Sequence, residues 1–133
     1  MNANIRTDEL RLLAYLHEHA TGYGSTHAMK ARAVFQSLGI EESQFRKDAS
    51  FLEQFGLVGL GFPPMVTLES NGKQSLIYLT GDGENLMREV EAQVEVKEPG
   101  RFKRIGLKAV EVAGDLVKAV AIKVLTDKLS GHK

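Results

Sequence analysis

The residues that could carry out chemistry are few in this sequence, and their spacing does not form a site. His17 and His19 flank Glu18, but side chains two residues apart point to different sides of a helix, which is not typical of a metal site. We expect the histidines to lie at the surface or at helix ends. Glu41 and Glu42 are typical of a helix start, where acids interact favourably with the helix dipole. We therefore predict that the protein is not an enzyme and holds neither a metal nor another cofactor.

Nucleotide-binding loops and thiol chemistry are also not indicated. Three glycine pairs have the spacing Gly-x-Gly, at Gly22/Gly24, Gly59/Gly61 and Gly81/Gly83. Each pair lacks the third glycine of a dinucleotide-binding loop, and the sequence has no Gly-Lys-Ser/Thr of a P-loop. The chain contains no cysteine, which excludes disulfides, cysteine–zinc sites and catalytic thiols. The glycines of the three Gly-x-Gly pairs are typical of turns.

Length and composition predict one globular domain, or one domain with an appendage. The chain has 133 residues, of which 43% are hydrophobic and 26% charged, so it is neither collagen-like nor wholly disordered. Its 17 basic and 17 acidic residues cancel, which argues against a histone-like protein that coats a polyanion by bulk charge. Neither a signal peptide nor a run of about 18 uncharged apolar residues is visible. We expect a cytoplasmic protein that does not bind membranes.

Apolar periodicity predicts five helices. They are expected near residues 8–20, 26–38, 42–55, 81–96 and 101–129. Thr7 or Asp8 can cap the first helix and Thr80 the fourth, because hydroxyl and carboxylate oxygens accept hydrogen bonds from free amides at helix starts. Gly39 and Gly56 are expected to end the second and third helices, and Gly39 suits the left-handed conformation of a helix end.

A short strand and a hairpin are predicted between the third and fourth helices. The strand covers Leu57–Leu60, and the prolines Pro63 and Pro64 interrupt it. The apolar and β-branched runs at 65–69 and 74–79 then flank Asn71-Gly72, the preferred pair for a two-residue type I′ turn.

This order of elements resembles the winged helix-turn-helix superfamily. Residues 31–58 resemble the helix-turn-helix, including its Leu-x-x-x-Gly-Leu-Val ending, and residues 65–79 resemble the wing. Residues 79–86 resemble the Leu-Thr-x-x-Gly-x-x-Leu junction that often begins the helix after a wing. Small bacterial and phage-encoded winged-helix proteins of unassigned function are closest in pattern. The resemblance, which covers roughly residues 7–95, implies a mainly α fold with a small β-hairpin in a winged domain (1–96). The residues after it predict a linker (97–100) and a long C-terminal helix (101–133).

The resemblance also implies DNA binding by a small transcriptional regulator. In DNA-binding members the third helix enters the major groove and the wing contacts the backbone or the minor groove. The residues implied to contact double-stranded DNA are Ser43, Gln44, Arg46, Lys47 and Ser50 on the helix and Asn71 and Lys73 at the wing tip. Arginine can form two hydrogen bonds to guanine, glutamine can do so to adenine, and serine and lysine suit phosphates. A solvated helix face without DNA is the alternative interpretation of the same residues.

Acidic residues near the third helix weaken the expectation of DNA binding. Glu41 and Glu42 lie beside the helix end that would face the groove, and Asp48 and Glu53 lie on the helix itself. Bases and acids balance between residues 28 and 80, so a single copy is expected to bind DNA weakly and with strong salt dependence. The alternative function is a winged-helix adaptor that binds a protein partner through the acidic fourth helix or the C-terminal helix.

The last predicted helix carries a heptad-like seam. Its members are Gly106, Val110, Ala113, Val117, Val120 and Val124. At 1.5 Å per residue the helix would span about 42 Å, which is longer than a small domain is wide, so the seam predicts a homodimer. The alternatives are a basic amphipathic helix on a membrane and a helix packed on its own domain. Because acids dominate up to residue 96 and bases after it, this helix is also expected to lie against the acidic fourth helix, within one chain or across a dimer.

Overall fold

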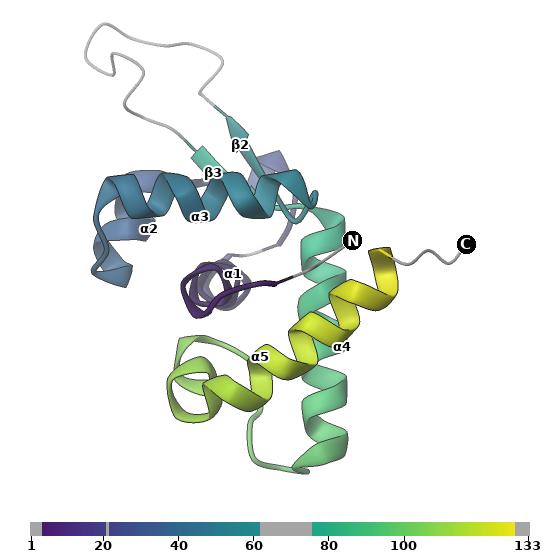
Figure 1. Cartoon of the computed structure of the whole chain (residues 1–133). Helices are drawn as coiled ribbons and strands as arrows, with labels where there is room; N and C mark the ends of the chain where they lie inside the picture. The colour runs from purple at the N-terminus through teal and green to yellow at the C-terminus, as the bar shows by residue number, and fades with distance from the viewer. Residues whose placement is uncertain (1–3, 21, 62–75, 130–133) are drawn as a thin grey trace, which may run out of the picture.

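The chain is mainly helical, with one small sheet. The computed structural model describes residues 4–20, 22–61 and 76–129 (Figure 1). The elements are α1 (Thr7–His19), a 3₁₀ turn η1 (Ser25–His27), β1 (Met29–Lys30), α2 (Ala31–Leu38), α3 (Glu42–Gln54), β2 (Val58–Gly61), β3 (Leu76–Leu79), α4 (Gly81–Lys97) and α5 (Leu107–Leu129). The predicted α+β class is confirmed.

Three antiparallel strands form the sheet in the order β1-β3-β2. Met29 lies opposite Ile77, and Val58 lies opposite Leu79. The second helix therefore begins at Ala31 and not near residue 26 as predicted, because Met29 and Lys30 pair with β3. The predicted strand 65–69 and the turn 70–73 lie outside the residues that the structure describes.

Local signals fix the ends of α2, α3 and α4 as predicted. Gly39 and Gly56 have φ angles of 70° and 73°, in the left-handed region that favours glycine. Thr80 caps α4, because its Oγ1 accepts a hydrogen bond from the amide of Gly83 at 3.0 Å. The same hydroxyl donates to the carbonyl oxygen of Gly56 at 2.5 Å. This one side chain therefore ties the start of α4 to the end of α3.

Helix α1 lies at the centre of the molecule. In Figure 1 it is seen nearly end on, with α3 above it and α5 below, and it contacts α2, α3, α4, α5 and β3. Leu10, Leu13 and Leu16 are fully buried. A single hydrophobic core extends from Ile5 to Leu125, so α5 shares its core with the preceding helices.

Helix α5 is shorter than predicted, and its apolar side packs on other helices of the same chain. It begins at Leu107, six residues later than expected, and its backbone leaves the helical region at Ala113 (φ −134°, ψ 44°). It packs on α1 and α4, so the expectation that one domain could not bury it is wrong. The seam residues Gly106, Val110, Val117, Val120 and Val124 are buried and Ala113 is partly buried.

That burial explains the heptad-like pattern without a second chain. The predicted dimer interface faces the chain's own helices, and a homodimer would have to use other residues. The expected contact between the C-terminal helix and α4 is present within one chain. Within the parts of the chain that the structure describes, none of the helices combines the length and apolar composition needed to cross a bilayer.

Candidate nucleic-acid interface

Helix α3 presents a polar face that its own packing leaves free. Phe45, Ala49 and Leu52 lie three and four residues apart and turn into the core. The residues on the opposite side of the helix are exposed, namely Ser43, Arg46, Lys47, Ser50 and Gln54. Four of the five predicted DNA-contacting residues of this helix are therefore on one accessible surface.

Gln44 is the exception among the predicted contacts. It is half-buried, and its Nε2 donates a hydrogen bond to Oδ1 of Asp48 at 2.8 Å. To reach an adenine, the amide would have to give up this bond. Its position supports a structural role at the edge of the helix.

Arg46 is exposed and forms an ion pair with Glu42, one turn earlier on the same helix. Its Nε and Nη2 donate to Oε2 of Glu42 at 3.2 and 2.6 Å, and its side chain is 75% exposed. An exposed pair of this kind contributes less than about 1 kcal/mol, so Arg46 can exchange Glu42 for a stronger acceptor at small cost. Lys47 has no ion pair within residues 4–20, 22–61 and 76–129.

Asp48 is buried, although the sequence suggested a surface acid. Its side chain is fully buried, Oδ1 lies 3.9 Å from Nη2 of Arg6, and Oδ2 has no hydrogen-bond partner in the described part of the chain. Burial raises the pKa of Asp48, and the hydrogen bond from Gln44 offsets this only in part. The sequence could have predicted this burial, since Asp48 falls on the same apolar stripe of the helix as Phe45 and Leu52.

Arg6 is a cation that the sequence reasoning missed. It occupies the N-cap of α1, one residue before the predicted caps, and its amide donates to Oε1 of Glu9 at 2.7 Å. Its Nε and Nη2 donate to Oε2 of Glu9 at 3.1 and 2.9 Å. The arginine side chain is 63% exposed, whereas that of Glu9 is 1% exposed. Arg6 precedes the apolar pattern of the first helix, so periodicity did not indicate which side chains it would lie beside.

Two hollows flank the exposed face of α3. The first, of about 500 Å³, lies between the start of α1 and α3 and is lined by Arg6, Glu9, Arg46, Lys47, Ser50, Phe51 and Gln54. The second, of about 620 Å³, lies between α2, α3 and β2. Its lining is largely apolar, with Ala31, Phe35, Phe45, Ala49, Leu60 and Gly61, and its charged members are Arg32, Glu42, Arg46 and Glu53. Arg46 belongs to both hollows, so it is central to this face. Asn71 and Lys73, the predicted wing contacts, lie outside the described residues.

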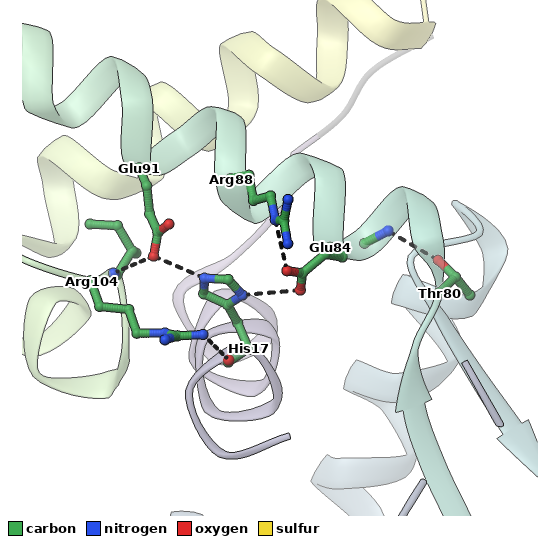
Figure 2. Close-up of polar contacts among 8 residues, drawn as sticks. His17, Thr80, Glu84, Arg88, Glu91 and Arg104 are labelled. Carbon is green, nitrogen blue, oxygen red and sulfur yellow. Dashed lines mark hydrogen bonds and ion pairs between the residues drawn. The ribbon is translucent and has the colours of Figure 1, made fainter. Parts of the chain in front are cut away.

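His17 lies in a buried polar cluster on the far side of α1. Figure 2 shows its ring between two carboxylates of α4: Nε2 lies 2.8 Å from Glu91 and Nδ1 lies 3.3 Å from Glu84. Of the two settings expected for the histidines, His17 has the helix end, since it lies in the last turn of α1, and not the surface, since its side chain is only 3% exposed. Arg104 donates to the carbonyl oxygen of His17 at 3.2 Å, and the amide of Ile105 donates to Glu91 at 3.0 Å.

The hydrogen bonds of the His17 cluster join α1, α4 and the loop before α5. The side chain of His17 is buried, whereas those of Glu84 and Glu91 are 15% and 27% exposed. Burial acts to raise the pKa of Glu84, but the hydrogen bond from Arg88 and the charge of His17 outweigh it, so the pKa is lowered. In the described part of the chain, no three His, Asp or Glu residues are placed to hold a metal ion.

The polar face of α3 and its two hollows are thus the strongest candidates for binding, because they are accessible and combine cations with hydrogen-bonding groups. Comparisons with protein-family models, with curated proteins and with solved structures found no match to this chain.

Proposed function

We propose that the protein binds double-stranded DNA as a small winged helix-turn-helix regulator, with α3 as the helix that enters the major groove. The element order α1, β1, α2, α3, β2, β3 and the sheet order β1-β3-β2 support the winged-helix assignment. The observation that carries the proposal is the exposed polar face of α3, with Ser43, Arg46 and Lys47 free of core packing. A helix of 13 residues is about 20 Å long and fits the major groove, which is about 12 Å wide.

Charge sets the expected strength of this binding. Arg46 is paired with Glu42 and Arg6 with Glu9, so Lys47 is the cation of this face without an ion pair among the described residues. Binding that depends on few phosphate contacts is weak at physiological salt and strengthens as salt is removed. Low-salt conditions are therefore the appropriate starting point for an assay.

The test is fluorescence anisotropy with labelled mixed-sequence duplex DNA, using wild type and the double variant Arg46→Ala/Lys47→Ala. We expect the double variant to bind at least about tenfold more weakly, since each lost contact costs about 1 kcal/mol or more. The matched control is Lys103→Ala/Lys108→Ala, which removes the same charge from exposed positions just before and at the start of α5. Helix α5 lies on the other side of α1 from α3 (Figure 1). No binding by wild type at low salt, or equal losses in both double variants, would contradict the proposal.

A protein-interaction adaptor is the second candidate, and one observation favours it. The larger hollow has an apolar lining with Phe35, Phe45 and Leu60, and both acids and bases at its edge, which suits a peptide or helix better than a polyanion. Leu60 is 39% exposed. If this function holds, Leu60→Asp abolishes capture of the partner in a pull-down, and Lys47→Ala, at a position outside this hollow, leaves it intact. The reverse pattern would contradict the adaptor.

A further inference from the structure

We propose that Arg6 is a second, separate point of contact with DNA: together with Lys47 and Ser50 it forms a seat for one backbone phosphate beside the groove that α3 enters. This inference rests on the proposed function. It adds α1 to an interface that the sequence placed only on α3 and the wing.

The geometry of the smaller hollow carries the inference. Arg6 comes from the start of α1, yet it lines the same hollow of about 500 Å³ as Arg46, Lys47, Ser50 and Gln54 of α3. Those four residues belong to the exposed face of α3. DNA that lies against this face would therefore place its backbone next to the Arg6 guanidinium.

The Arg6 side chain is held in place before any ligand arrives. Both bonds from its guanidinium go to one oxygen of Glu9, whose other oxygen is fixed by the Arg6 amide. A guanidinium has five N–H groups, and these contacts use two of them. The side chain remains 63% exposed, so further N–H groups can reach an outside acceptor. Because the side chain is already ordered by a buried partner, it loses little rotamer freedom when it binds.

The chemistry of the hollow fits a phosphate better than a base edge. Its exposed polar groups are two guanidinium groups, an ammonium, a hydroxyl and an amide, and each of them can donate hydrogen bonds to phosphate oxygens. The acid in the hollow, Glu9, is buried and already paired with Arg6. A contact of this kind positions the duplex and carries no sequence information of its own.

The experiment measures salt-dependent binding to two labelled duplexes of unrelated mixed sequence. The test variant is Arg6→Ala/Glu9→Gln, which removes the cation without leaving Glu9 as a buried unpaired carboxylate, since glutamine keeps the oxygen that accepts the residue 6 amide. Asp48, which lies 3.9 Å from Arg6, keeps its hydrogen bond from Gln44. One lost phosphate contact lowers the slope of log affinity against log salt by about 0.9, which is about eightfold in affinity at 0.1 M salt. We expect this loss to be equal for both duplexes, and Lys47→Ala to show a similar one.

Arg101→Ala is the matched control, because Arg101 also pairs with an acid three residues away, Glu98. It lies in the loop between α4 and α5, on the far side of α1 from α3 in Figure 1. Circular dichroism establishes that each variant is folded. The inference is overturned, and the proposed function is not, if the wild type binds DNA and Arg6→Ala/Glu9→Gln binds equally well. The same holds if Arg6→Ala/Glu9→Gln weakens binding no more than Arg101→Ala does. A wild type that does not bind either duplex at low salt overturns both.

Discussion

Replacing His17 by alanine tests whether the buried cluster holds the helices together. The ring lies between Glu84 and Glu91 of α4, at 3.3 and 2.8 Å. A neutral imidazole has one N–H and can donate to only one carboxylate, so both contacts are hydrogen bonds only when the ring is protonated. His17→Ala removes both bonds and leaves two partly buried carboxylates without their shared partner.

The expected cost follows from burial. Breaking a buried ion pair by removing one partner costs about 3–5 kcal/mol. The carboxylates of Glu84 and Glu91 are 15% and 27% exposed, so water can recover part of that loss and the lower end applies. We expect His17→Ala to lower the free energy of unfolding by about 3 kcal/mol, which corresponds to a melting temperature about 10 °C lower for a chain of this size.

Urea unfolding followed by circular dichroism measures this change, since the chain contains no tryptophan to report by fluorescence. His19→Ala is the matched control: it lies on the same helix, its side chain is 47% exposed, and we expect a loss below about 1 kcal/mol. The pKa of Glu84 is lowered in the folded chain, so its contribution is present above its ordinary value of 4.5 and is lost as the pH falls below it. The stability gap between wild type and His17→Ala should therefore narrow in acid. Equal losses in the two histidine variants would refute this reasoning.

Three further predictions concern single positions. Asp48→Asn should raise the free energy of unfolding at pH 7. Burial raises the pKa of Asp48, so its charge destabilises the folded chain at a pH above the ordinary pKa of 3.8. The gain in the free energy of unfolding should therefore vanish when urea unfolding is measured below that pH. Thr80→Ala should cost about 1–2 kcal/mol in the same assay, because it removes a helix cap and a second hydrogen bond, and a loss near zero would contradict the cap. Val117→Ala should cost about 2–3 kcal/mol, independent of protein concentration, because its contacts lie within one chain; Val112→Ala, at a 55% exposed position of the same helix, should change stability by less than about 0.5 kcal/mol. A cost at Val117 that disappears on dilution would instead indicate a dimer contact.

The features that the sequence predicted correctly depend on neighbouring residues. A left-handed glycine at Gly39 or Gly56 and a hydroxyl cap at Thr80 require only a few adjacent positions, and their chemistry is specific. The exposed face of α3 was also predictable, because apolar residues at i, i+4 and i+7 fix which side is free.

The features that sequence reasoning missed depend on partners far along the chain. Strand β1 is two residues long and exists because Met29 and Lys30 meet β3, more than 40 positions away. The start of α5 is set by Glu18, whose carboxylate accepts a hydrogen bond from the Leu107 amide at 3.1 Å. A Cβ on Gly106 would lie 2.4 Å from that carboxylate, so this glycine permits the close approach. Periodicity alone cannot reveal which chain covers an apolar seam.

The burial of that seam changes what the DNA proposal requires. A helix paired with a second copy would have compensated for a weak single interface by linking two of them. Because α5 instead covers α1 and α4, a chain cut after Pro99 would expose core surface, and its association in solution would not report on a dimer. Under the proposed function, without a dimer through this seam, additional affinity for DNA would come from contacts that one copy makes outside the face of α3. We propose Arg6 as such a contact, because it is exposed, held in position by Glu9, and lies on the same hollow as Lys47.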